Sequence, residues 1–407
     1  MLDKISANVN PPKQDLSSLS LLGDTPPLFG NPLHVGRPNI GKRDALLTRL
    51  SNMLDRRWLT NDGPFVRELE SRCAEFIGVK HCVAVANATL GLQIAARVLE
   101  VKGKVLVPAF TFIGTAHALS WIGLEPVFCD VLPGEHTLDP EDVNQKMGPG
   151  VGAILGVHLW GRPCRVAALQ RIADTHCLPL MFDAAHALGS SLHGRKVGCF
   201  GRVEVFSLHA TKLINGMEGG LITTNDELVA QELRLVRNYG FVGVDQSASL
   251  GINAKMNEFS AAMALTNLEA YPDFLTHNAR IRQIYADGLS DLEGVCVVPQ
   301  PEEGSTKLHY FVLDITNQSP VSRDSLYAVL WAENIYARRY FRPGCHRSPP
   351  YSEIDAVPNL PVTDALSARL LQLPTGQQMT EQSTRSVVQL IRFCHSRGRD
   401  LEALLTG

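Results

Sequence analysis

The segment from residue 82 to residue 183 alternates short apolar runs with amphipathic stretches, and this alternation limits the fold more than any other feature. The apolar runs are CVAVA (82–86), KVLVP (104–108), PVFCD (126–130), GAILGV (152–157) and PLMFD (179–183). Strands covered by helices on both faces are typically continuous apolar runs, and such strands form parallel sheets. The pattern therefore predicts an α/β domain with a buried, mostly parallel sheet.

The first 40 residues do not share this alternation. PPK, DTPP and NPL interrupt any hydrophobic period, so we expect an N-terminal arm over residues 1–40 that packs on the surface. The body of the protein then begins near Gly41. Gly63 and Pro64 precede apolar residues at helical spacing and Gly78 follows them, which predicts a helix between these glycines.

After Asp183 the pattern changes to the short strands and turns of GSSLHGRKVG, VEVFSLHATK and GGLITTND, followed by helices over 226–238 and 257–270. A long helix from Pro272 would lead to a second region. There VCVVP (295–299) and KLHYFVLDI (307–315) predict strands, and residues 322–334 predict a helix. We expect a large domain over 41–275 and a small C-terminal domain over 276–407.

Composition excludes several classes of protein. The net charge of −3 gives no reason to expect a nucleic acid as partner. No apolar run reaches the roughly 18 residues that a membrane span requires, and the N-terminus lacks the apolar core of a secretory signal, so we expect a cytoplasmic protein. The nine cysteines include no CxxC pair, which favours reduced core thiols and no metal site.

Two candidate sites lie where predicted strands end. In Asn87-Ala88-Thr89-Leu90-Gly91 a strand leads into a helix, and the free N–H groups there suit a phosphate; the alternative is that Asn87 or Thr89 only caps the helix. Asp183 ends the run PLMFD, where open α/β sheets bind ligands. Its partner would be a pyridinium nitrogen or an arginine, unless it only caps the following turn.

Lys212 forms the third candidate site. It lies in a turn between two predicted strands, among the hydroxyl residues and glycines of SLHATKLINGMEGG. Lysines usually lie on solvated faces, but an amine with a lowered pKa can form a Schiff base with a carbonyl group. Together the three candidate sites would supply N–H groups for a phosphate, a carboxylate for a ring nitrogen and an amine for an aldehyde. Pyridoxal phosphate carries these three groups.

Longer segments resemble the DegT/DnrJ/EryC1/StrS family of sugar aminotransferases. The resemblance extends over roughly residues 40–375 and includes GPFVRELE, VPAFTFIGTAHA, GVHLWGRPC, DAAHALGSSLHGRKVG, VFSLHATKLINGMEGGLITTND and GINAKMNEFSAAMAL. It implies a fold-type I, aspartate-aminotransferase-like enzyme that uses pyridoxal 5′-phosphate. That fold has a large domain with a seven-stranded, mostly parallel sheet and a smaller C-terminal α/β domain.

The resemblance also assigns roles to residues. Lys212 would form the internal aldimine with the cofactor and then carry the proton between the substrate carbon and the cofactor, which is present as pyridoxamine phosphate in the half-reaction. Asp183 would keep the pyridine nitrogen protonated. Phe112 would stack on the ring, unless it is a core aromatic. The phosphate would be held by Ser207, Ala88 and Thr89.

Further residues are implied less directly. Asn253 would reach across a homodimer to the phosphate of the neighbouring subunit. His186 stands where glutamine is commoner and would lie beside the 3-hydroxyl or the ring face, or else be a core histidine. His209 would be structural or near the substrate. Tyr340 and His346 in YFRPGCH resemble the family's Y-x-P-x-H stretch, and of these His346 would contribute to the substrate site.

The implied reaction is a ping-pong transamination from glutamate or glutamine to a nucleotide-linked keto-sugar. C4 of dTDP-4-keto-6-deoxyglucose is the favoured position, and the alternatives are a 3-keto sugar, a cyclitol ketone and a ketone outside sugar metabolism. A related dehydratase has histidine in place of the lysine, so Lys212 argues against that activity. A non-catalytic binding or regulatory protein need not keep Lys212, Asp183 and Ser207 together.

Overall fold

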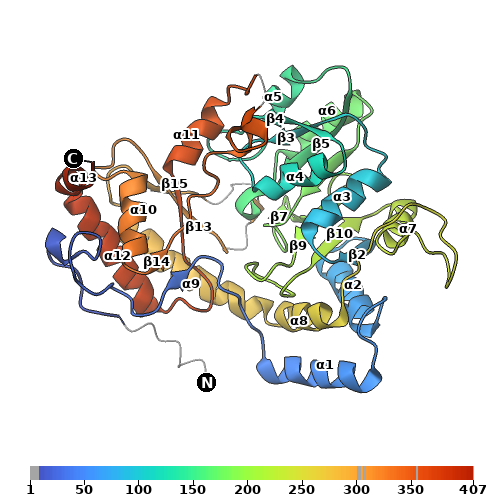
Figure 1. Cartoon of the computed structure of the whole chain (residues 1–407), viewed down its shortest axis with the longest axis horizontal. Coiled ribbons are helices and arrows are strands. Elements are labelled where there is room, and N and C mark those ends of the chain that lie inside the picture. The colour runs from blue at the N-terminus through green and yellow to red at the C-terminus, as the bar shows by residue number, and fades with distance from the viewer. Residues whose placement is uncertain (1–8, 300–303, 306–308, 354–355, 407) are drawn as a thin grey trace.

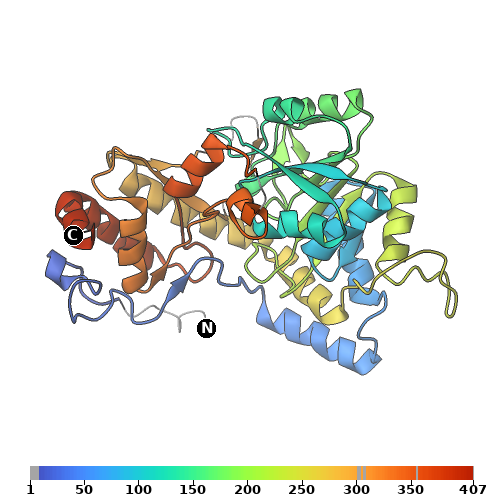
Figure 2. The same ribbon diagram turned by 45° about the horizontal axis from the view of Figure 1, so that its top comes forward.

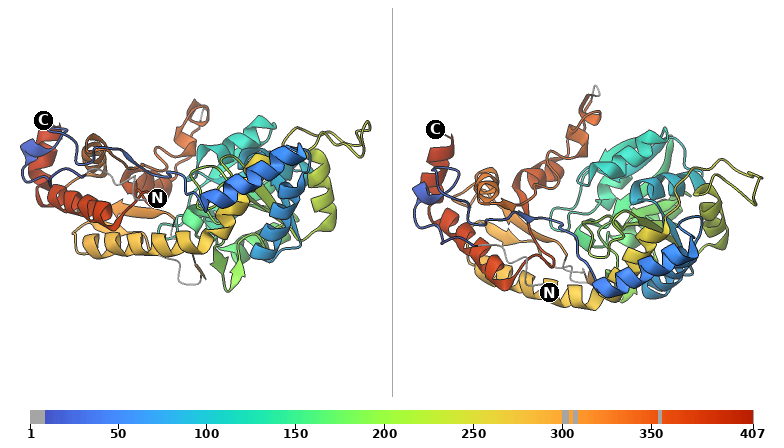
Figure 3. Two further views of the ribbon diagram at one scale, coloured as in Figure 1. Left: turned by 90° about the horizontal axis from the view of Figure 1, so that it is seen from below. Right: turned by 60° about the horizontal axis from the view of Figure 1, so that its bottom comes forward.

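The computed structural model describes residues 9–299, 304–305, 309–353 and 356–406, which form two lobes joined by the long helix α9 (Tyr271–Leu289) (Figure 1). Figure 3 shows α9 running along the small lobe to the edge of the large lobe. The large lobe contains the sheet predicted from the sequence, and the small lobe contains most of the C-terminal part of the chain. Part of the predicted strand 307–315 and residues 1–8 of the arm lie outside the described residues.

The large lobe is built on a seven-stranded sheet of order β2-β10-β9-β6-β5-β3-β4. Only β10 is antiparallel to its neighbours. This sheet confirms the predicted α/β class, and the five apolar runs supply five of its strands. The strands are β2 (His81–Val85), β3 (Lys104–Pro108), β4 (Glu125–Cys129), β5 (Val151–Val157), β6 (Leu180–Asp183), β9 (Val203–Ser207) and β10 (Gly220–Thr224).

Helices cover both faces of this sheet. One face packs against α3 (Ala88–Val98), α4 (Ile113–Trp121) and α7 (Glu227–Val236). The other face packs against α1 (Arg43–Arg56), α2 (Pro64–Ile77), α5 (Pro140–Gln145), α6 (Val166–Thr175) and α8 (Glu258–Glu269). Because both faces are covered, most strand residues are buried, and a ligand must approach the sheet at the strand ends.

The predicted helix after Gly63 is α2, and its N-terminus is capped from a distant segment. The carboxylate of Glu258 accepts hydrogen bonds from the backbone N–H groups of Phe65 (2.9 Å) and Val66 (2.8 Å). A side chain at position 63 would collide with this carboxylate, because a Cβ there would lie 2.4 Å from its carboxyl carbon. The glycine is therefore required by a tertiary contact as well as by the turn.

The small lobe has a three-stranded antiparallel sheet of order β11-β13-β15. Its strands are β11 (Val295–Val297), β13 (Phe311–Ile315) and β15 (Leu370–Leu373), and its helices include α10 (Arg323–Ala332), α11 (Pro361–Arg369), α12 (Glu381–Ser396) and α13 (Gly398–Thr406). The predicted domain boundary at residue 275 falls inside α9. Phe274 packs in the core of the large lobe and Ile281 in that of the small lobe, so the change of lobe occurs between them.

The N-terminal arm is part of the small lobe, which corrects the expectation that it packs on the surface. Leu19, Leu28, Phe29 and Leu33 are almost completely buried in the core of that lobe. Strand β1 (Leu33–His34) pairs in parallel with β14 (Ile335–Tyr336). Figure 2 shows the arm lying along the small lobe before it continues into α1 beside the large lobe.

A buried ion pair anchors this arm. The ammonium group of Lys13 lies 3.2 Å from Glu333, and both side chains are buried. Glu333 also accepts hydrogen bonds from the backbone N–H groups of Ser20 (2.8 Å) and Leu28 (2.6 Å). The substitution Glu333→Ala leaves the buried ammonium of Lys13 without its counter-charge and two N–H groups without their acceptor, so we expect the free energy of unfolding to fall by about 3–5 kcal/mol.

Urea unfolding followed by circular dichroism measures this loss. The matched control is Glu75→Ala on the exposed side of α2, which should change stability by less than about 0.5 kcal/mol. Equal stability of the two variants would show that the ion pair does not hold the arm.

The cysteines match the expectation of core thiols only in part. Seven of the nine cysteines are buried and free, whereas Cys177 and Cys296 are exposed and so are not core thiols. Within the described ranges no group of three or more His, Cys, Asp or Glu side chains could hold a metal ion. Among the described helices, none combines the length and the apolar character needed to cross a membrane.

Candidate active site

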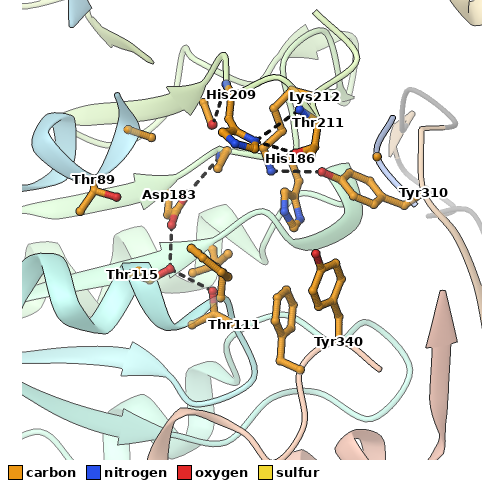
Figure 4. Close-up of a pocket in the computed structure, with 18 of the residues that line it drawn as sticks. Thr89, Thr111, Thr115, Asp183, His186, His209, Thr211, Lys212, Tyr310 and Tyr340 are labelled. Atoms are coloured by element: carbon orange, nitrogen blue, oxygen red, sulfur yellow. Dashed lines mark hydrogen bonds between the residues drawn. The ribbon is translucent and has the colours of Figure 1, made fainter. Parts of the chain in front are cut away.

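A cavity of about 720 Å³ opens between the two lobes at the ends of the large sheet. It brings together seven of the nine residues predicted for the site, namely Ala88, Thr89, Phe112, Asp183, His186, Ser207 and Lys212. The small lobe contributes residues such as Tyr310 and Arg338, and the N-terminal arm contributes Val35 and Gly36. Figure 4 shows how the polar side chains converge on this cavity.

The turn from β2 into α3 forms one end of the cavity. The side chain of Asn87 accepts a hydrogen bond from the N–H of Leu90 (2.9 Å), so Asn87 is the N-cap of α3. The first N–H groups of a helix have no acceptor within the helix, and Ala88 and Thr89 supply two of them where they line the cavity. The two interpretations of this segment are therefore compatible.

Asp183 ends β6 and is buried against the cavity. Its carboxylate accepts hydrogen bonds from the hydroxyl of Thr115 (2.8 Å) and the N–H of Ala185 (3.0 Å). Burial raises the pKa of this carboxyl, although these two hydrogen bonds and the positive charge of Lys212 act in the opposite direction. Burial therefore makes the negative charge costly, and a cation in the cavity would stabilise it.

Lys212 lies in the loop between β9 and β10 and points its amine into the cavity (Figure 4). The amine lies 3.4 Å from the hydroxyl of Tyr310. Burial lowers the pKa of Lys212 from 10.5 to about 8, and the negative charge of Asp183 offsets part of this effect. Near physiological pH the amine is therefore neutral, and thus nucleophilic, far more often than a lysine in water.

An aromatic wall surrounds His186. The ring of His186 stacks with Trp160 at a centroid distance of 5.8 Å and lies 4.5 Å from the ring of Tyr310. Its Nδ1 accepts a hydrogen bond from the N–H of Trp160 (3.4 Å), which leaves Nε2 as the protonated nitrogen. Burial, followed by the nearby charges of Lys212 and His309, lowers the pKa of His186 well below 6.5, so the imidazole is neutral.

Phe112 is not a core aromatic. Its side chain lines the cavity and is 56% exposed, unlike most large apolar residues of this lobe. Ser207 also lines the cavity at the end of β9, where its hydroxyl accepts a hydrogen bond from the N–H of His209 (3.2 Å). An exposed aromatic ring beside a hydroxyl group and unpaired helix N–H groups would suit a planar ligand that carries a phosphate.

Two predicted residues lie outside the cavity. His346 is completely buried in a short helix, and its Nε2 lies 3.2 Å from Asp364. We therefore do not assign His346 to the substrate site. Asn253 is an exposed residue in the segment before α8, where its backbone pairs with Asn238.

Several cavity residues were not predicted from the sequence, notably Thr115, Tyr310, Arg338 and Gln372. Thr115 lies in the segment VPAFTFIGTAHA, which follows a predicted strand. It is one helical turn after Thr111, and this position near the strand end is the signal that could have identified it. The other three come from the small lobe. No local pattern marks these three residues, because only the packing of the lobes places them at the cavity.

The two-lobed architecture, with a lysine and a carboxylate at the strand ends of a mostly parallel sheet, is that of fold-type I, aspartate-aminotransferase-like enzymes. Residues 42–392 match the model of the DegT/DnrJ/EryC1/StrS aminotransferase family. The chain belongs to this family and is an aminotransferase. The predicted resemblance and fold are thereby confirmed.

Several relatives carry names that refer to nucleotide sugars. The chain is 31% identical over 361 residues to the dTDP-4-amino-4,6-dideoxy-D-glucose transaminase of Escherichia coli. The aligned region covers 88% of this chain and 97% of the relative. The chain is also 31% identical to the GDP-perosamine synthase of Caulobacter vibrioides over 82% of this chain and 91% of that protein. The solved structure of DesI in the presence of its TDP-sugar product has 44% identity and a TM-score of 0.93, and covers 97% of this chain and 100% of that one.

Proposed function

We propose that the protein transfers an amino group from glutamate or glutamine to C4 of a nucleotide-linked 4-keto-6-deoxy sugar, with dTDP-4-keto-6-deoxyglucose as the favoured acceptor. The observation that carries this proposal is that Lys212 and Asp183 line one cavity in a chain so similar to DesI. The names of DesI and the Escherichia coli relative favour a dTDP-linked sugar.

The cavity residues fit pyridoxal phosphate. The N–H groups of Ala88 and Thr89 and the hydroxyl of Ser207 would hold the phosphate, and the exposed ring of Phe112 would cover one face of the pyridine. Asp183 would pair with the ring nitrogen, and the protonated Nε2 of His186 can donate a hydrogen bond toward the 3-hydroxyl. When bound, the cofactor supplies an electron-withdrawing ring that stabilises negative charge on the substrate carbon.

Lys212 would have two roles in this reaction. Its amine would attach the cofactor covalently, and after release it would carry the proton to and from the substrate carbon. Tyr310 lies close enough to hold the free amine in place, because its hydroxyl is 3.4 Å from Nζ. Burial raises the pKa of Tyr310 well above 10, so its hydroxyl stays protonated.

The pKa of Lys212 predicts how cofactor capture depends on pH. Only the neutral amine attacks an aldehyde, so the rate at which the apoprotein attaches pyridoxal phosphate should rise with pH and level off above about 8. Stopped-flow absorbance after mixing the two components measures this rate. A rate that keeps rising to pH 10, as for a lysine in water, would contradict the lowered pKa.

The substrate is tested with a panel of nucleotide-linked 3-keto and 4-keto sugars, with glutamate or glutamine as donor. We expect release of the keto acid with the dTDP-linked 4-keto-6-deoxy sugar, faster than with 3-keto sugars or cyclitol ketones. If every sugar fails while a non-sugar ketone reacts, the proposed acceptor is wrong. Failure of every ketone would instead favour a non-catalytic role for this scaffold.

We also propose a homodimer and a cytoplasmic location. The homodimer proposal places Asn253, which is exposed in the single chain, at the phosphate of the neighbouring subunit. Sedimentation at several concentrations tests the dimer. In Asn253→Ala, weaker binding of pyridoxal phosphate with an unchanged dimer would support the shared site.

A further inference from the structure

The turn that carries Lys212 is held partly by its own residues and partly by the small lobe. The N–H of Lys212 donates a hydrogen bond to the carbonyl of His209 (2.8 Å), and the hydroxyl and N–H of Thr211 lie 2.9 and 3.3 Å from Nδ1 of His209 (Figure 4). These contacts all lie inside the turn. Among the described residues, the hydrogen bonds that reach Thr211 and Lys212 from a distant segment come from His309 and Tyr310.

His309 bonds to the peptide group directly before the lysine. Its Nε2 lies 2.8 Å from the carbonyl oxygen of Thr211, and a carbonyl oxygen only accepts, so Nε2 carries the proton. Burial lowers the pKa of His309 to about 4, so the ring is neutral and Nδ1 is unprotonated. The backbone of His309 is itself held, because its carbonyl accepts a hydrogen bond from the hydroxyl of Thr375 (2.5 Å). The ring therefore offers one donor in a fixed position.

A histidine carries a cost at this position. His309 is buried, and its Nδ1 has no hydrogen-bond partner among the residues that the structure describes. A buried nitrogen without a partner is unfavourable, and an apolar side chain of similar size would avoid that cost. Packing alone therefore does not account for the histidine, whereas the hydrogen bond from Nε2 to Thr211 does.

The next residue extends the contact to the amine. The hydroxyl of Tyr310 lies 3.4 Å from Nζ of Lys212, and the rings of His309 and Tyr310 pack edge to face with centroids 4.8 Å apart. All three residues line the cavity. Two consecutive residues of the small lobe thus contact the lysine at both ends, one at its backbone and one at its amine. Fixing both ends of a long side chain restricts where its amine can lie.

We propose that His309 is a positioning residue that fixes the backbone of Lys212 and so aims its amine into the cavity. This inference rests on the proposed aminotransferase reaction. His309 moves no proton in this role, since its Nε2 stays bonded to the carbonyl of Thr211. Reacting atoms must come within about 3–3.5 Å of each other, and a displacement of about 1 Å can lower a rate by about 100-fold.

The test compares replacements of His309 that differ in the donor they keep. The amide nitrogen of His309→Gln reaches about as far as Nε2 and can donate to Thr211, whereas the amide of His309→Asn is too short. His309→Leu keeps the apolar bulk but has no donor. The matched control is His277→Leu, because Nε2 of His277 also bonds to a backbone carbonyl, that of Gly376 at 3.0 Å, but His277 does not line the cavity.

The first measurement is the rate at which the full-length apoprotein attaches pyridoxal phosphate, followed by stopped-flow absorbance. We expect His309→Leu to react about 10- to 100-fold more slowly at the high-pH plateau, with the midpoint of the pH dependence still near 8. A neutral ring contributes no charge, so its loss changes the orientation of the amine and not its pKa. His309→Asn should be as slow as His309→Leu, His309→Gln should recover most of the rate, and the control should match wild type.

The second measurement is hydrogen exchange of the full-length protein, which does not depend on the reaction. In His309→Leu the amides of residues 209–216 should exchange at least about tenfold faster than in wild type. His277→Leu should leave these amides unchanged. Thermal melting confirms that each variant is folded.

A wild-type rate of attachment in His309→Leu overturns the proposal. A midpoint moved toward about 10, as for a lysine in water, also overturns it, because the histidine would then act by burying the amine. Recovery by His309→Asn instead of His309→Gln, or equal slowing in His277→Leu, overturns it as well. If the wild-type protein attaches no pyridoxal phosphate, the proposed function fails, and faster exchange in His309→Leu still shows that His309 holds the turn.

Discussion

Replacing Lys212 with alanine is expected to lower transamination by at least about 10⁴-fold, because one amine both attaches the cofactor and carries the proton. Lys212 is the one lysine among the described residues that line the cavity. Other groups would still hold the cofactor without a covalent bond, so its content should fall less than activity does. Steady-state turnover and the visible spectrum of the purified variant measure the two effects.

The variant should remain folded, since a buried amine is removed and no hydrogen-bonded carboxylate loses a partner. The matched control is Lys80→Ala, which removes an exposed lysine directly before β2. Reduction of the wild-type enzyme with borohydride and peptide mapping should then locate the cofactor on Lys212. Labelling of another lysine, or wild-type turnover in the alanine variant, would refute the assignment.

Replacing Asp183 with asparagine is expected to lower turnover by about 10³-fold while changing stability little. Asparagine keeps the size of the side chain but removes the charge that would hold a proton on the ring nitrogen. The site can accommodate the amide, because the hydroxyl of Thr115 can donate to Thr111 at 3.0 Å when it no longer donates to position 183. Single-turnover kinetics with glutamate isolate this effect from the binding of the sugar.

The variant Asp183→Glu separates charge from position. It restores the negative charge one methylene further out, so its activity should lie between those of wild type and Asp183→Asn. If Asp183→Asn reacts within tenfold of wild type, the carboxylate does not control the cofactor ring. Binding of pyridoxal phosphate should weaken much less than turnover in both variants, because the phosphate contacts are unchanged.

Much of the large lobe could be predicted from the sequence because its signals are local. Each apolar run is short and is followed by a helical period, so β2, β3, β4, β5 and β6 follow from residues within a few positions of one another. Asp183 and Lys212 stand out for the same reason, since each is an ionisable residue in a segment where such residues are unusual. The resemblance to the family then connected these separate signals.

The remainder depends on contacts between distant residues. Arg338 and Gln372 meet through a single backbone bridge, and neither has a neighbouring sequence pattern that marks it as a cavity residue. His346 lies in a motif that resembles the family's substrate segment, yet its packing against Asp364 buries it away from the cavity. The prolines of the arm interrupt the short apolar series that includes Leu19, Leu28 and Phe29, so the sequence pattern predicts a surface segment although these side chains are buried.

The position of the arm has a consequence for how the chain is made. Leu28 is synthesised early, but its partner Glu333 follows 305 residues later. During translation the large lobe can fold while the apolar side chains of the arm still lack the core that buries them. We therefore expect the small lobe to be the last part of a nascent chain to become protease-resistant, and to close only after α12 has left the ribosome.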